Sequence, residues 1–108
     1  MTTVCVTVDD EQRVGGGWGR ARRVALADVV DGAVVGWHEE DVRWDESHDD
    51  EGEGKHHARI VRFLRDNGVE VVVTGHMGPP MQHTLGLLGV RVVLGAVGDA
   101  REAAVAAA

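Results

Sequence analysis

Short valine-rich runs alternate with segments of helical periodicity in the second half of the chain, and this alternation constrains the fold most. VEVVV at 69–73 and VRVVL at 90–94 are too short for buried helices, so they predict buried strands. Crossovers between strands of one sheet are right-handed and usually contain a helix, so these two strands are expected to be parallel. The predicted helices run from His56 to the Asn67–Gly68 pair, from Pro79 and Pro80 onward, and over DAREAAVA at 99–106 with Asp99 as N-cap.

The first half of the chain has the pattern of a three-stranded meander. TVCVTV at 3–8, RVALADVV at 23–30 and AVVGWHEEDVRW at 33–44 are rich in β-branched residues, and Asp31-Gly32 suits a tight hairpin. DESHDDEGEGK at 45–55 has neither periodicity nor apolar residues and predicts a solvated loop. We therefore expect one α/β domain over residues 1–108, with the element order β-β-β-α-β-α-β-α. Its mixed five-stranded sheet, flanked by helices, would have the order 3-2-1-4-5 with strand 2 antiparallel.

Composition excludes several classes of protein. The net charge is −7 and the basic residues are scattered, so a nucleic-acid partner is not expected. No apolar run approaches the roughly 20 residues that a membrane span needs, which favours a cytoplasmic protein without a membrane partner. Cys5 is the only cysteine, which rules out an internal disulfide, and its place inside VCVTV predicts a buried thiol.

Four segments with chemically active side chains are expected at one edge of the sheet. If the meander runs up, down and up, strands one, three and four end together, and open α/β sheets bind ligands at that carboxyl edge. The edge would collect GGGWGR at 15–20, the acidic loop, the start of the first helix, and TGHMGPP at 74–80. Imidazole is the commonest protein ligand of transition metals, so the candidate metal ligands are His76, His57, His56 and His48.

Structural roles are the alternative for these histidines. His76 could hydrogen-bond its own turn, and one of His56 and His57 could pack while the other is exposed. The helical pattern places His57 nearer the centre of the buried face. His83 is expected in solvent, opposite Met81, Leu85 and Leu88, and His38 is expected to be an ordinary sheet residue.

The three tryptophans suggest either packing or contacts with a partner. Trp18 is expected to be a lid or an interface anchor, with simple packing as the alternative. Trp37 and Trp44 would lie in the third strand, an edge strand, where they could make a homodimer contact.

Four stretches of the chain, taken in order, resemble a known family. They are the loop ending in GWGRA, the hairpin VALADVVDGAVV, FLRDNGVEVVVTGHMGPP, and LGLLGVRVVLGAVGDAREA. Together they resemble the dinitrogenase iron-molybdenum cofactor biosynthesis family, the domain type of NifX, NafY and the C-terminal part of NifB. The resemblance implies a ribonuclease H-like α/β domain that carries iron-sulfur or iron-molybdenum clusters or their precursors. The family loop commonly reads His-Phe-Gly, with the histidine associated with cofactor binding, whereas the matching positions here are Gly17-Trp18-Gly19.

A ribonuclease H-like fold also suggests a metal-dependent nuclease, with Asp9 or Asp10 and Asp28 as ligands. No third carboxylate is clearly placed, and the acidic charge counts against a nucleic-acid substrate. Ser47 is the only serine and has no evident base, so we do not expect an enzyme.

The expected function is non-enzymatic binding of a metal or metal cluster, as a carrier or accessory domain. The cofactor would be an iron-sulfur or iron-molybdenum cluster by resemblance, or a single transition-metal ion held at a site shifted toward His76. The expected cofactor-binding positions are Gly17, Trp18, Gly19, Arg20, Gly75 and Gly78. The alternative is a metal-free protein-interaction or regulatory module that uses Trp18 and the acidic 45–53 loop.

Overall fold

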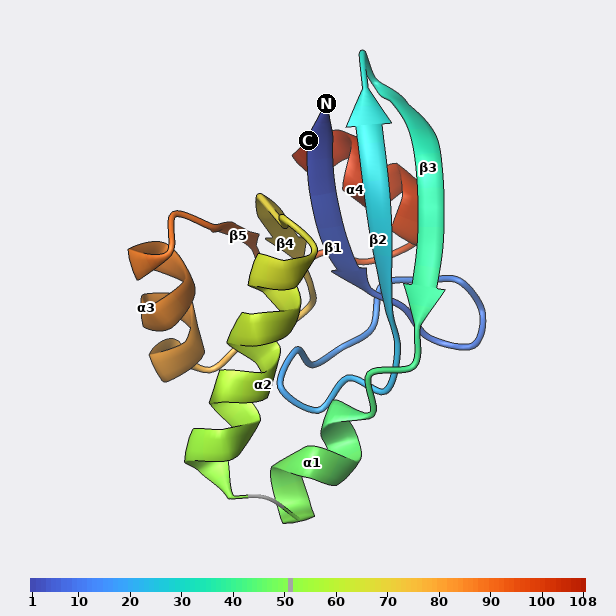
Figure 1. The fold of residues 1–108 in the computed structure, drawn as a ribbon. Helices are drawn as coiled ribbons and strands as arrows, with labels where there is room; N and C mark the ends of the chain where they lie inside the picture. The colour runs from blue at the N-terminus through green and yellow to red at the C-terminus, as the bar shows by residue number, and fades with distance from the viewer. Residues whose placement is uncertain (51) are drawn as a thin grey trace.

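Five strands form one mixed sheet in the computed structural model, which describes residues 1–50 and 52–108 but not the side chains of residues 48–50 and 53. The strands are β1 (Thr2–Thr7), β2 (Val24–Val30), β3 (Ala33–Glu40), β4 (Val71–Val73) and β5 (Arg91–Val93). Their order is β3-β2-β1-β4-β5, with β1, β4 and β5 parallel and β2 antiparallel to both of its neighbours (Figure 1). The predicted strand order and directions are confirmed.

Two hydrophobic clusters lie on opposite faces of the sheet, because alternate residues of a strand point to opposite faces. Cys5 of β1 and Val72 of β4 belong to one cluster, whereas Val6 and Val73 belong to the other. The valine-rich strands are buried on both sides, which explains why β1 and β4 contain continuous apolar runs instead of alternation.

Helices cover both faces of the sheet. In Figure 1, α2 lies in front of the sheet and α4 lies behind it. Ile60 and Leu64 of α2 are buried in the first cluster, and Ala100 and Ala104 of α4 are buried in the second. None of the described helices is both long enough and apolar enough to cross a membrane. The helices are α1 (Trp44–Asp50), α2 (Glu53–Asp66), α3 (Pro79–Leu87) and α4 (Ala100–Ala107).

The predicted local signals are mostly confirmed. Asp31 and Gly32 adopt φ angles of 49° and 77°, as a two-residue hairpin requires. Asp99 caps α4 by accepting a hydrogen bond from the amide of Glu102 at 3.0 Å. Leu88 is an exception, because α3 ends one residue earlier and leaves Leu88 40% exposed.

The predicted solvated loop at 45–55 is wrong. β3 ends at Glu40, Arg43 adopts a φ of 53°, and the chain then forms α1 and the start of α2. The amide of Trp44 donates to the carbonyl of Ala21 at 2.9 Å, which ties the start of α1 to the loop after β1. No helical periodicity is visible in this segment, because only Trp44 and Ser47 are buried among the residues of α1 whose side chains are described.

Candidate functional site

The glycine-rich loop after β1 lies against the turn between β4 and α3. The amide of Trp18 donates to the carbonyl of His76 at 2.9 Å, and Gly17 and His76 form a parallel bridge. The amide of Gly75 donates to the carbonyl of Gly15 at 3.2 Å. Two segments that are far apart in the sequence therefore form one continuous edge at the carboxyl ends of β1 and β4. This junction brings His76 to the GWGR loop.

The junction requires glycine at position 75. A Cβ added to Gly75 would lie 2.7 Å from the carbonyl oxygen of Gly16 and 3.2 Å from its Cα. The hydroxyl of Thr7 lies 3.0 Å from that of Thr74 and 3.1 Å from the carbonyl oxygen of Gly15, so polar contacts also join β1 to both segments. Backbone contacts rather than large side chains thus hold the loop and the turn together.

Trp18 fixes the loop to the core. It is 1% exposed, and its ring centroid lies 4.8 Å from that of Trp44 in an edge-on arrangement. Trp44 in turn packs edge-on against Phe63 at 5.7 Å. The indole nitrogen of Trp18 has no hydrogen-bond acceptor among the described residues. The ring nevertheless adds apolar burial and aromatic contacts of about 0.5–1.5 kcal/mol per pair.

The expected roles of two tryptophans at a partner interface are therefore wrong. Trp18 is neither a lid nor an exposed anchor, because Trp44 and the rest of the core cover it. Trp44 begins α1 and is 1% exposed, so it is not part of an edge strand. Trp37 does lie in β3, and the guanidinium of Arg101 stacks on its ring at 4.6 Å.

His56 is a core residue at the start of α2. It is 1% exposed, and its Nδ1 lies 2.9 Å from the Oγ of Ser47 in α1. Its Nε2 would lie 3.8 Å from a Cβ added to Gly19, so the imidazole lies under the glycine-rich loop. His56 thus joins α1, α2 and that loop.

His57 is half-buried beside it, with ring centroids 6.2 Å apart. The prediction that His57 lies nearer the centre of the buried face is wrong. His56, Ile60 and Leu64 are each separated by four residues and form the buried stripe of α2. The helical pattern gave the wrong expectation because Val61 is apolar but only partly buried, and Val61 shares the face of His57.

The remaining described histidines are exposed. His76 is exposed at the junction, and His83 is exposed on α3 as predicted. His38 is exposed on β3, with its Nε2 2.9 Å from Glu40. The side chain of His48 lies outside the described residues.

No preformed metal cage is visible in the described part of the chain. There, no three His, Cys, Asp or Glu side chains gather closely enough to hold a metal ion. Cys5 is fully buried, and this burial raises the pKa of its thiol far above the usual range. Cys5 is therefore a protonated thiol of the core at neutral pH.

A cleft of about 300 Å³ lies beside the glycine-rich loop, between residues 7–10, 15–17 and 20–23. Arg20, an expected cofactor-binding residue, lines it. Hydrogen bonds from the backbone amides of Arg13 and Glu11 lower the pKa of Asp9, which stays charged at the rim. The cleft therefore contains charges of both signs next to the junction.

The carboxylates suggested for a nuclease do not meet. Asp28 pairs with Thr3 near the start of β1, and its Oδ1 accepts a hydrogen bond from the Thr3 hydroxyl at 3.2 Å. Asp9 follows the other end of β1, about 20 Å away at the usual rise of a strand. Asp28 and Asp9 cannot share a metal ion.

The sequence showed no evident base for Ser47, whereas the structure places its hydroxyl against the imidazole of His56. The hydrogen bond between Ser47 and His56 joins α1 to α2. The only available signal was the position of Ser47 three residues after Trp44, which places both on one face of a helix.

Several solved structures are similar to this chain, whereas no curated protein matches it. The crystal structure of PH0822 has a TM-score of 0.74 at 21% identity, covering 94% of this chain and 85% of that chain. The apo form of the orange protein from Desulfovibrio gigas has a TM-score of 0.73 at 22% identity, with coverages of 95% and 83%. The NMR structure of a Thermotoga protein of the DUF35 family, provisionally named NifB, has a TM-score of 0.65 at 25% identity, with coverages of 95% and 84%.

The structural neighbours show that this arrangement of sheet and helices recurs in other proteins. The family model described as "Dinitrogenase iron-molybdenum cofactor" matches residues 1–108. The chain therefore belongs to the dinitrogenase iron-molybdenum cofactor family.

Proposed function

We propose that this protein is a carrier or accessory protein that binds an iron-sulfur or iron-molybdenum cluster, or a precursor of one, as cargo. Its family is associated with that cofactor and contains carrier and accessory proteins rather than typical enzymes. The cargo would bind at the carboxyl edge of the sheet, where the glycine-rich loop meets the turn before α3. The observation that supports this proposal most is the bridge between Gly17 and His76.

Gly17 occupies the position at which the family loop commonly has its cofactor-associated histidine. Residues paired in a bridge lie side by side, so an imidazole at position 76 reaches the surface that an imidazole at position 17 would reach. Both residues are exposed, and a Cβ added to Gly17 would meet nothing within 4 Å. His76 therefore supplies a ligand close to the place where this chain lacks the usual one.

The number of available ligands favours cargo that arrives with other ligands in place. A zinc ion takes three or four protein ligands and a resident iron-sulfur cluster usually takes four, so two histidines suit a cluster that keeps terminal ligands of its own. We assign His76 as the first ligand and the half-buried His57 as the second, while His56 holds the loop in place. Few ligands also suit cargo that must leave again.

The surroundings of the junction suit a bulky anionic group only in part. The cleft next to the loop offers about 300 Å³ and the side chain of Arg20. The N-terminus of α3 contributes partial positive charge. Pro79 and Pro80 lack amide hydrogens, however, so this terminus donates few hydrogen bonds. The cargo must therefore be held mainly by side-chain ligands.

Anaerobic reconstitution tests the proposal. Tag-free protein is incubated with ferrous iron and sulfide, desalted, and assayed for bound iron, bound sulfide and visible absorption. We expect His76→Ala to lower cluster occupancy at least about five-fold, since one of two ligands is lost. His83→Ala removes an equally exposed histidine from α3 and should leave occupancy unchanged.

A rescue variant separates loss of a ligand from loss of structure. Adding Gly17→His to His76→Ala returns an imidazole to the family position, where the structure leaves space for a side chain. We expect occupancy to recover. The proposal is wrong if wild-type protein retains no cluster, or if His76→Ala retains as much as the wild type.

The metal-free interaction module is not supported in the form expected from the sequence. It relied on Trp18 as an exposed anchor, and Trp18 is buried.

A further inference from the structure

Four cations lie on the solvent side of α2 in a chain with a net charge of −7: Lys55, Arg59, Arg62 and Arg65. A hollow of about 370 Å³ runs along this helix, lined by Lys55, Ala58, Arg59, Arg62, Phe63 and Asp66. A second hollow of about 460 Å³ shares Ala58, Arg62 and Asp66 with it and extends to Arg65. We refer to the two together as the α2 groove.

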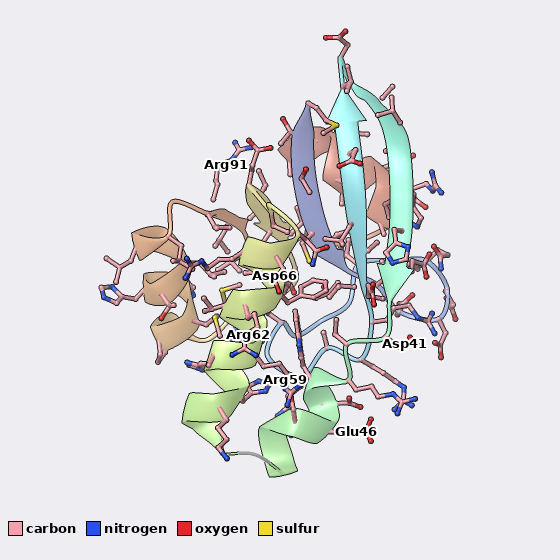
Figure 2. All side chains as sticks on the ribbon, in the orientation of Figure 1. Asp41, Glu46, Arg59, Arg62, Asp66 and Arg91 are labelled. Atoms are coloured by element: carbon pink, nitrogen blue, oxygen red, sulfur yellow. The ribbon has the colours of Figure 1, made fainter. Side chains whose placement is uncertain are left out.

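Arg62 of this groove differs from Arg22 and Arg23 in its pairing. Arg22 pairs with Asp45 at 3.5 Å, and Arg23 pairs with Asp41 at 3.1 Å. Among the side chains that the structure describes, no carboxylate pairs with Arg62. Figure 2 shows that Asp41, the partner of Arg23, lies beyond the end of β3 and away from Arg62 on α2. The guanidinium of Arg62 therefore faces solvent within the groove.

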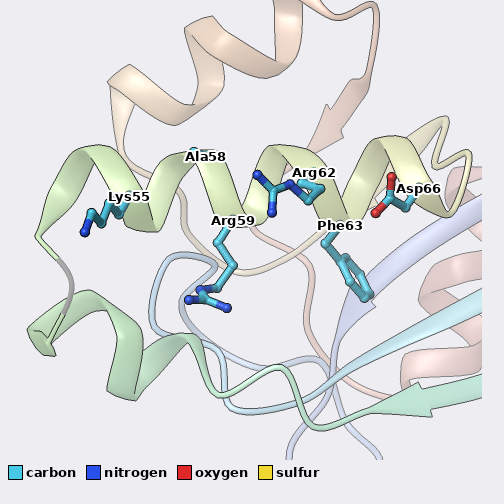
Figure 3. Close-up of a pocket in the computed structure, with 6 residues that line it drawn as sticks. All are labelled: Lys55, Ala58, Arg59, Arg62, Phe63 and Asp66. Atoms are coloured by element: carbon cyan, nitrogen blue, oxygen red, sulfur yellow. The ribbon is translucent and has the colours of Figure 1, made fainter.

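The groove also has an apolar part. Phe63 is half-buried, and the ring packs edge-on against Trp44, so its position is fixed by the core. Figure 3 shows Arg59 and Phe63 extending from the same side of α2. Ala58 leaves room between the long side chains at the surface. A ligand in this groove would thus meet cations and an immobile aromatic ring together.

We infer that the α2 groove docks an acidic segment of a partner protein. Carboxylates of that segment would pair with the arginines, whose planar forks match carboxylate geometry, and an apolar side chain would contact Phe63. A duplex nucleic acid is disfavoured, because its phosphates would extend beyond this one helix face onto a surface of net negative charge, whereas a short acidic segment would contact the groove alone. Lys55 immediately precedes His56 and His57, so the docked segment would lie next to the proposed cargo edge.

The inference is tested on metal-free protein, so its outcome is independent of the cargo proposal. The probe is a fluorescein-labelled amphipathic peptide of glutamate and leucine, titrated with protein while fluorescence anisotropy is recorded. We expect Arg62→Glu to weaken binding at least about ten-fold, because a charge-assisted hydrogen bond is replaced by repulsion. Arg13→Glu changes the net charge equally on an exposed loop and should weaken binding less than about two-fold. Circular dichroism checks that both variants are folded.

Several results would overturn the inference. One is wild-type protein that does not bind the peptide, and another is equal weakening by both variants, which indicates unspecific attraction. Tighter binding of duplex DNA, lost in Arg62→Glu, would identify a nucleic-acid surface instead. A change of oligomeric state in Arg62→Glu without peptide would show that a second copy of the chain occupies the groove.

Discussion

Replacement of Gly75 by alanine should destabilise the protein and loosen the junction at the carboxyl edge. The φ angle of Gly75 is not in the left-handed region, so the backbone itself tolerates a side chain. The added Cβ would instead lie 2.7 Å from the carbonyl oxygen of Gly16 and 3.3 Å from that of Gly15. Because all of these neighbours are backbone atoms, the loop and the turn have to separate by several tenths of an ångström.

The size of the effect follows from three contributions. Overpacking of a close contact costs about 1–3 kcal/mol. Separation also weakens the hydrogen bonds from Gly75 to Gly15 and from Trp18 to His76, each of which contributes about 1 kcal/mol. The loss of glycine's freedom in the unfolded chain offsets this by about 0.4–1 kcal/mol. We therefore expect Gly75→Ala to lower the free energy of unfolding by about 2 kcal/mol, which corresponds to a decrease in Tm of about 10 °C.

Urea and thermal unfolding, monitored by circular dichroism, measure this difference in the free energy of unfolding. Gly16→Ala provides the matched control. Gly16 lies on the other side of the same contact, but a Cβ added there meets nothing within 4 Å and its φ is not positive. Its replacement should change the free energy of unfolding by less than about 0.5 kcal/mol. If Gly75→Ala is as stable as the wild type, or if both variants lose the same stability, the described contact does not determine the stability of the junction.

Two further predictions concern the end of α3 and the pH dependence of stability. Gly86 lies inside α3 with open space around it, so Gly86→Ala should stabilise the protein by about 0.5–1 kcal/mol. Gly89 has a φ of 76°, so Gly89→Ala should destabilise it by about 1 kcal/mol. Equal changes of the two variants in urea unfolding would contradict this prediction. Hydrogen bonds from backbone amides lower the pKa of Asp9 in the folded state. The Asp9 carboxylate therefore stabilises the fold at any pH above the pKa that Asp9 has in the unfolded chain. This contribution is lost as the pH falls through the lower pKa of the folded state. The stabilities of wild type and Asp9→Asn should therefore converge as the pH is lowered from neutral toward about 3, and a difference that stays constant with pH would refute this role.

The sheet was predictable because its determinants are local. β1 and β4 are valine-rich runs that are buried on both sides, and the hairpin and helix boundaries coincide with Gly32, Gly68 and Pro79. The preference for adjacent sequential strands and right-handed crossovers then favours the observed order of the strands. α1 was not predictable in the same way, because its position depends on Trp44 packing against Trp18 and on hydrogen bonds to the loop after β1. These contacts join residues that are far apart in the sequence.

The same reason limits what the sequence says about the site. Periodicity shows that His56 and His57 lie near the inner face of α2, but it does not show which imidazole the core accepts. That choice is made by Ser47, which supplies a hydrogen-bond partner from α1, and by the glycine-rich loop, whose Gly19 lies next to the ring. Both contacts arise from elements that only the fold brings next to α2.

The burial of Trp18 explains how the glycine-rich loop keeps its conformation in a chain that lacks the usual loop histidine. Trp18 lies in the core, and its amide is bonded to the carbonyl of His76, so the conformation of the loop is determined by packing and backbone contacts. No ligand at position 17 is needed for that conformation. The bridge from Gly17 to His76 holds the two residues side by side. An imidazole at either position would therefore lie at the same part of the carboxyl edge. If the proposed function is right, the fold constrains where the ligand is presented more strongly than it constrains which of these two residues presents it.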